Sequence, residues 1–245
     1  MGDSCVPGAS FATLRLLSQY PRLQVPAHSK IGPDASRAFE PACENCPRLA
    51  AFLADVRGSQ PTYHARPVPS FGDPRARLLI VGLAPGMHGA NRTGRPFTGD
   101  HAGILLFRTL FELGFSSAPE SVSATDGLNL VDCRITNAVR CLPPANKPTP
   151  SEVRECNAYL GWELERLPEQ GAVLALGAIA HGAVLRAYGL RPVAARFAHA
   201  ATHELPGGRL LVDSYHCSRY NTQTRRLTPT MFADAMALAR EWVRR

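Results

Sequence analysis

Four of the seven cysteines are spaced like the ligands of a metal centre. Cys43 and Cys46 form a CxxC pair, in which two thiolates on one turn can bind a single centre. Cys141 and Cys156 lie far downstream, on either side of a capping box at 149–152 that predicts a helix start. That helix start brings the second pair of thiols to one place. An iron–sulfur cluster, a tetrahedral zinc ion and four unrelated buried thiols are the three interpretations of this pattern.

A glycine-rich loop at residues 82–100 is the second candidate for chemistry. Its sequence is GLAPGMHGANRTGRPFTGD. Phe97 lies in a tight glycine–proline context, where an aromatic ring on a rigid loop can stack on a nucleobase. An ordinary core position is the alternative interpretation of this ring. Asp100 follows at an expected helix start.

Four short apolar runs are expected to form the strands that position these residues. The runs cover residues 77–84, 132–139, 172–177 and 209–216. Helical patterns lie between and after them, at 102–113, 151–167, 179–188 and 228–243. This alternation predicts an α/β fold with a mostly parallel sheet and helices on both faces. Ligands bind outside the carboxyl ends of such strands, which here carry the start of the glycine-rich loop, Asn137 and His216.

Composition favours one cytoplasmic domain with a polyanionic partner. The chain has 245 residues, 45% of them hydrophobic, and a formal net charge of +7. We expect an N-terminal arm at 1–40 and one domain at 41–245, acting as a monomer. The segment at 58–75 has four prolines and is expected to be a loop. No signal-peptide pattern is present, and the longest apolar stretch, at 171–185, is too short to span a membrane.

Three separated motifs, together with the order of the four cysteines, resemble family 5 uracil-DNA glycosylases (the UDGb type). The motifs are GLAPG…GRPFTGD, ITNAVRC and SYHCSRYNTQTRRLT, and the resemblance covers about residues 40–235. It implies a three-layer α/β/α sandwich with a four-stranded, mostly parallel sheet and a pocket for a flipped base. It also implies a structural [4Fe–4S] cluster held by Cys43, Cys46, Cys141 and Cys156.

The resemblance implies a DNA-repair hydrolase that cleaves the N-glycosidic bond of uracil and leaves an abasic site. Hypoxanthine, xanthine and other deaminated or damaged bases are further expected substrates. His216 would donate a hydrogen bond to the pyrimidine O2, and the Asn137 amide would match a uracil edge. Gly82, Ala84 and Phe97 would complete the base-binding set.

The water-activating residue departs from the pattern of family 4. Family-4 enzymes resemble GEAPG in the first motif, whereas this chain has Leu83 and Ala84, which cannot activate water. Asp100 is therefore the nearest carboxylate, and Asn146 is the second candidate. A further departure is Cys217, where proline is more usual, so the φ restraint of that loop is lost.

A polar, basic segment at 217–226 follows His216 and is expected to contact DNA. Hydroxyls, amides and arginines suit phosphates and insertion into a vacated base stack. The DNA-binding candidates are Ser218, Arg219, Tyr220, Asn221 and Arg225. Taken alone, the composition of this segment is equally typical of a solvent-exposed loop.

Two other function classes remain for comparison. One is a non-catalytic iron–sulfur or zinc module that only binds DNA. The other is a zinc hydrolase, for which we expect no suitable set of three His/Asp ligands with an open position. No lysine motif suggests Schiff-base chemistry, so simple hydrolysis is expected.

Overall fold

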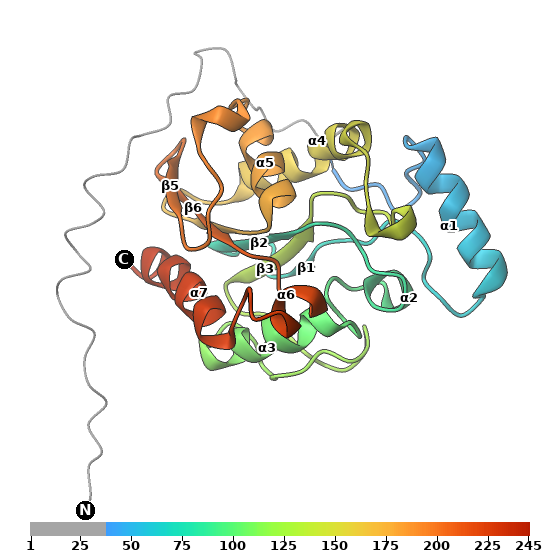
Figure 1. Ribbon diagram of the computed structural model, residues 1–245, viewed down its shortest axis with the longest axis horizontal. Helices are drawn as coiled ribbons and strands as arrows, with labels where there is room; N and C mark the ends of the chain where they lie inside the picture. The colour runs from blue at the N-terminus through green and yellow to red at the C-terminus, as the bar shows by residue number, and fades with distance from the viewer. Residues whose placement is uncertain (1–37) are drawn as a thin grey trace, which may run out of the picture.

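A computed structural model describes residues 38–245, which surround a six-stranded sheet (Figure 1). The strands are β1 (Phe71–Gly72), β2 (Leu78–Gly82), β3 (Cys133–Asn137), β4 (Ala172–Leu176), β5 (Thr202–Leu205) and β6 (Arg209–Ser214). Their order across the sheet is β1-β3-β2-β4-β6-β5. The inner four strands are parallel and are the four that the apolar runs predicted. The expected strand number was wrong, because β1 and β5 add an antiparallel strand at each edge.

Helices cover both faces of the sheet, as the alternating pattern predicted. They are α1 (Pro47–Ser59), α2 (Ala90–Thr93), α3 (His101–Glu112), α4 (Pro150–Arg166), α5 (Ala178–Ala187), α6 (Arg219–Gln223) and α7 (Pro229–Val243). Two short 3-10 turns lie at Pro144–Asn146 and Pro192–Ala194. In Figure 1, α3 and α7 lie on one face of the sheet, and α4 and α5 lie on the other. The three-layer α/β/α architecture is therefore confirmed.

The parallel strands are buried on both faces, which explains their almost unbroken apolar sequences. In β2, Leu78 and Ile80 pack into the core under α3 and α7, whereas Leu79 and Val81 pack toward α4 and α5. All four side chains are at most 2% exposed. Each such burial contributes roughly 1.5–3 kcal/mol of transfer free energy, so this central strand fixes the two outer layers.

Helix caps set where the site-bearing helices begin. Asp100 caps α3 by accepting a hydrogen bond from the backbone N–H of Gly103 at 3.0 Å. Thr149 and Glu152 form the predicted capping box at the start of α4. The 58–75 segment is mostly loop, but it also contains the end of α1 and all of β1.

The expected N-terminal arm at 1–40 falls almost entirely outside the described residues. Within residues 38–245, no helix has the length and apolar character needed to cross a membrane.

Candidate active site and cysteine cavity

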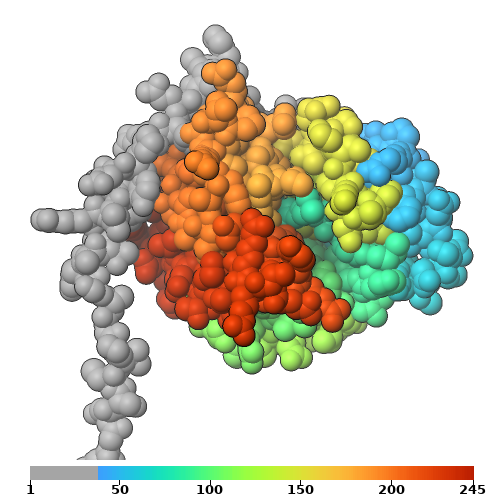
Figure 2. Space-filling model, in the orientation of Figure 1, coloured from blue at the N-terminus to red at the C-terminus, as the bar shows by residue number. Residues whose placement is uncertain are grey.

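A pocket opens at the carboxyl ends of β2 and β3. It has a volume of about 390 Å³, within the range of small-molecule sites. Its lining is formed by Leu83, Ala84, Gly86, Ala90, Phe97, Asp100, Ala102, Asn137, Asn146, His216 and Ser218. Figure 2 shows a hollow where the red C-terminal part, the yellow segment near residue 150 and the blue-green segment meet. The fold thus brings together seven residues that the sequence singled out.

Asn137 lines this pocket and carries an unsatisfied acceptor. The residue ends β3 and is 3% exposed, and its Oδ1 is buried without a hydrogen-bond partner in the described structure. Gly82 lies beside it, and a Cβ there would collide with Oδ1 of Asn137 and the ring of Phe97. A buried amide oxygen left unpaired costs about 1–3 kcal/mol. Such a group is expected where a ligand supplies the missing donor.

Phe97 forms one wall of the pocket in a strained conformation. Its φ is +56°, a left-handed value that is costly for a residue with a bulky side chain. The neighbouring Arg95 holds the turn, since its Nε donates to Oγ1 of Thr98 at 2.9 Å and its guanidinium pairs with Asp126 at 2.6 Å. Arg95 is 4% exposed, so this ion pair is buried. The turn is therefore fixed before any ligand arrives.

His216 faces Phe97 across the pocket. It follows β6 by two residues, and its ring centroid lies 6.0 Å from that of Phe97 at an interplanar angle of 27°. The Nδ2 of Asn221 donates to the backbone carbonyl of His216 at 2.8 Å, which fixes the turn. Burial lowers the pKa of His216 to about 4. The imidazole is therefore neutral near pH 7 and carries one N–H for donation.

Asp100 is the carboxylate of the pocket. Its Oδ1 caps α3, and its Oδ2 lies toward Gly86 and Gly89, where a side chain on Gly89 would collide with it. Burial raises the pKa of Asp100, and backbone N–H groups at the start of α3 partly offset this effect. Asn146 lies at the exposed rim in a left-handed conformation with a φ of +56°.

The four cysteines line a second, largely apolar cavity beside the first. Cys43 and Cys46 lie before α1, Cys141 follows β3, and Cys156 lies in the second turn of α4. Other lining residues include Leu49, Val139 and Tyr159. The spacing argument is confirmed to this extent, because two distant pairs of thiols surround one space.

Polar contacts tie the two halves of the cysteine cavity together. Arg48 at the start of α1 pairs with Glu152 at the start of α4 at 2.7 Å. The backbone N–H of Arg140 points at Sγ of Cys156 at 3.3 Å. Burial, together with neighbouring thiols, raises the pKa of Cys141 to about 12, and burial raises that of Cys156 to about 11. The thiols become thiolates only if a positive centre compensates.

Comparisons with known proteins agree with this architecture. The family model of the uracil DNA glycosylase superfamily matches residues 69–240. A type-5 uracil-DNA glycosylase of Thermus thermophilus is 52% identical over 204 residues, covering 81% of this chain and 93% of the relative. The type-5 uracil-DNA glycosylase of Pyrobaculum aerophilum is 44% identical, covering 80% of this chain and 87% of its own. That of Mycobacterium tuberculosis is 43% identical, with coverages of 81% and 77%.

This chain belongs to the uracil DNA glycosylase superfamily, among the type-5 family. Sequence reasoning missed two residues that line the pocket of this family member and one that supports it. Ala90 and Ala102 line it from the starts of α2 and α3, and alanine gives no signal in a single sequence. Arg95 was also missed, although it stands within the GRPFTGD motif.

The DNA-binding candidates of this type-5 chain separate into two groups. Ser218 lines the pocket and caps α6 by accepting from the backbone N–H of Asn221 at 3.4 Å. Arg219, Tyr220 and Arg225 lie outside the pocket and are exposed. Asn221 uses its amide to hold the His216 turn.

Proposed function

We propose that this chain hydrolyses the N-glycosidic bond of uracil in DNA and leaves an abasic site. The observation that carries the proposal is the unpaired Oδ1 of Asn137, which lies in a pocket with a neutral His216 and a rigid Phe97. Uracil carries an N–H beside a carbonyl. The Asn137 amide, with one acceptor and two donors, complements that edge.

The flipped base then lies against Phe97, and the missing side chain of Gly82 leaves room for Asn137 and Phe97 to lie close together beside it. When the bond breaks, negative charge develops on the departing base. His216 stabilises it by donating its single N–H to the pyrimidine O2. One preorganised donor of this kind contributes about 3 kcal/mol in a water-excluded site.

Asp100 acts at the other end of the breaking bond. Its carboxylate faces the sugar, where positive charge develops, and it positions the attacking water. Leu83 and Ala84 offer no polar group for this task. Asn146 at the rim is the alternative group for orienting the water.

The same pocket favours a wider set of deaminated bases. Hypoxanthine and xanthine carry the same pairing of an N–H with a neighbouring carbonyl, so the Asn137 amide matches all three bases. Phe97 stacks on any planar base. We therefore include hypoxanthine and xanthine among the substrates.

Arg219, Tyr220 and Arg225 are the groups that contact the DNA around the flipped nucleotide. Their exposure beside the pocket supports this role, because exposed arginine and tyrosine side chains can reach the phosphates that flank the flipped nucleotide. We propose that the protein acts as a monomer formed by the domain at 41–245.

We propose that the cysteine cavity holds a [4Fe–4S] cluster and not a zinc ion. Four thiolates on tetrahedral zinc lie about 3.8 Å apart, given bonds of about 2.3 Å. Among residues 38–245, no three cysteine sulfurs lie within 4.8 Å of one another. Cys43, Cys46, Cys141 and Cys156 would therefore hold the larger group. It would supply structural anchoring of the 141–156 segment rather than a reacting site.

A single assay tests the activity. The protein is incubated with a duplex containing one uracil, then with alkali, and strand scission at that position is expected. A thymine duplex and an Asn137→Ala variant purified in the same way are the controls. Binding of the uracil duplex without scission would instead support a non-catalytic DNA-binding module.

Metal analysis tests the cofactor separately. Protein purified without oxygen should be brown and hold about four iron atoms per chain. Folded, colourless protein with one zinc ion bound by the cysteines would contradict the cluster.

A further inference from the structure

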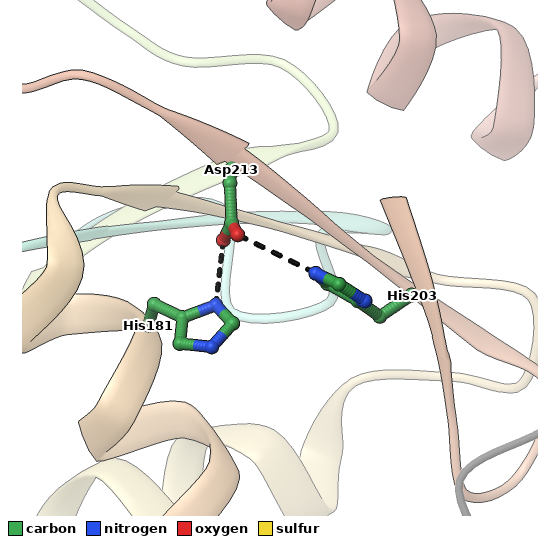
Figure 3. A group of neighbouring side chains, drawn as sticks. All are labelled: His181, His203 and Asp213. Carbon is green, nitrogen blue, oxygen red and sulfur yellow. Dashed lines mark hydrogen bonds and ion pairs between the residues drawn. The ribbon is translucent and has the colours of Figure 1, made fainter. Parts of the chain in front are cut away.

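His181, His203 and Asp213 form a mostly buried group of side chains at β6, the strand that leads to His216 (Figure 3). His181 comes from α5, His203 from the edge strand β5 and Asp213 from β6. One ligand atom of each lies within 4.8 Å of the other two, and no other such group occurs among residues 38–245. We expected no suitable set of three His/Asp ligands with an open position, and the fold does bring three such side chains together.

The contacts of His181 require either one more proton or a metal ion between its ring and Asp213. Its Nε2 lies 3.1 Å from the carbonyl oxygen of Ala195, which only accepts, so Nε2 carries a proton. A neutral imidazole then has a lone pair on Nδ1, and this atom lies 2.8 Å from Oδ1 of Asp213. Two acceptors at that distance repel each other unless a second proton or a metal ion lies there.

A second proton on His181 leaves the other half of the group unsatisfied. Nε2 of His203 and Oδ2 of Asp213 are 3.5 Å apart, and both are buried without a hydrogen-bond partner in the described structure. This separation is too long for a good N–H···O bond. It is close to the distance of about 3.4 Å between two ligands of tetrahedral zinc. The 2.8 Å between Nδ1 of His181 and Oδ1 of Asp213 is a hydrogen-bond distance, so this pair has to separate slightly when a metal ion binds. One metal ion therefore satisfies all three side chains.

We infer that His181, His203 and Asp213 bind one zinc ion, with water in the fourth position. Two imidazoles and a carboxylate form a ligand set that suits zinc. The hydrogen bond from His181 to Ala195 is the outer contact that orients a metal-binding histidine. Asp213 is fully buried, whereas the His203 side chain is 17% exposed, so the ion enters past His203.

Zinc at this position fastens the base of the His216 turn. Asp213 precedes His216 by three residues on one continuous segment. The backbone N–H of Tyr215 donates to Nδ1 of His199 at 3.2 Å, and the two rings stack at 5.1 Å. The metal adds a bond between the same two segments, through His203 and Asp213. It therefore acts as a positioning group outside the pocket.

Metal titration of the full chain tests this site. Protein purified without oxygen and dialysed against a chelator is titrated with Co²⁺, which reports its ligands by its spectrum. We expect one equivalent bound without thiolate charge-transfer bands, which separates this site from the cysteines. Zinc should displace the cobalt and raise the unfolding midpoint by about 5–10 °C at 100 times its dissociation constant.

Two variants make the test specific. His203→Gln removes one ligand but keeps the His181–Asp213 contact. It should weaken cobalt binding at least tenfold, because the loss of a residue that only supports a ligand already costs roughly that much. His199→Gln, on the same segment, should bind cobalt as the wild type does. The inference is overturned if the wild type binds no cobalt outside the cysteines, or if His203→Gln binds it equally well. Neither readout depends on glycosylase activity, so the proposed function is tested independently.

Discussion

The base pocket and the cysteine cavity lie side by side, yet they are built in opposite ways. The pocket collects costly features: an unpaired acceptor on Asn137, a left-handed Phe97 and a desolvated carboxylate on Asp100. The cavity is mostly apolar, and the Arg48–Glu152 ion pair closes it. Unsatisfied and strained groups are typical of sites that meet a ligand. Under the proposed function, we therefore expect changes in the pocket to affect reaction rate and changes in the cavity to affect stability.

Removing one of the four cysteines proposed to hold the cluster should have the largest effect, and that effect should be a loss of stability. We expect Cys156→Ala to lower the free energy of unfolding by about 3 kcal/mol or more, because the binding energy of a structural metal is folding energy. Denaturant unfolding followed by circular dichroism, with iron counting, measures this. Cys133→Ala, in the buried strand β3, and Cys5→Ala, in the N-terminal arm, are the controls and should lose less. Equal losses in Cys156→Ala and Cys133→Ala would remove the special role of the cavity.

Removing the histidine of the pocket should affect rate alone. We expect His216→Ala to slow uracil excision in single turnover by roughly a hundredfold or more, since one donor to the departing base is lost. Its unfolding free energy near pH 7 should stay close to that of the wild type. His216→Gln, which keeps a donor, should recover part of the rate. Wild-type rates in the His216→Ala variant would show that His216 does not contact the departing base.

Replacing Asp100 should slow the excision of hypoxanthine more than that of uracil. Asparagine also caps helices well, so Asp100→Asn should leave α3 and DNA binding nearly intact. Hypoxanthine is a poorer leaving group, so its excision should slow by roughly tenfold more than that of uracil. Burial raises the pKa of Asp100 above the ordinary aspartate value of about 3.9. The wild-type hypoxanthine rate should therefore fall as the pH drops through this raised pKa, because the carboxylate becomes protonated. The variant should lack this acid limb, and wild-type rates on both bases would shift the water-positioning role to Asn146.

The smallest effect should come from the exposed arginines. Arg219→Glu and Arg225→Glu should weaken binding to damaged and undamaged duplex alike. The slope of log affinity against log salt is negative, and each lost phosphate contact should make it shallower by about 0.9. Arg186→Glu on α5 is the matched charge reversal and should leave the slope unchanged. If all three variants behave alike, the 217–226 segment lies outside the interface.

The sequence predicted the parts of the molecule that have a strong local pattern. The four inner strands and α3, α4, α5 and α7 were found within a few residues, because their apolar periods are long and regular. The edge strands were missed because β1 has two residues and β5 is polar at its centre. Such short strands exist only through their pairing with a neighbour.

The site was predictable where residues lie at strand ends and unpredictable where the fold joins distant positions. Asn137 and His216 follow strands that end at one edge of the sheet, so topology alone placed them together. His181, His203 and Asp213 come from three elements with no motif spacing. Only the folded structure, which brings a side chain of α5 beside side chains of β5 and β6, reveals that group.

The order of the strands has a consequence for how the chain is made. β2 is central and pairs with β3 on one side and β4 on the other, as Leu78 does with Cys133 and Ala172. A ribosome releases β2 long before β4, so one edge of an apolar strand waits for its partner. An open strand edge of this kind is a template for pairing with another nascent chain. Slow translation between residues 138 and 171 should therefore lower the yield of folded protein, although every residue of the finished pocket is unchanged.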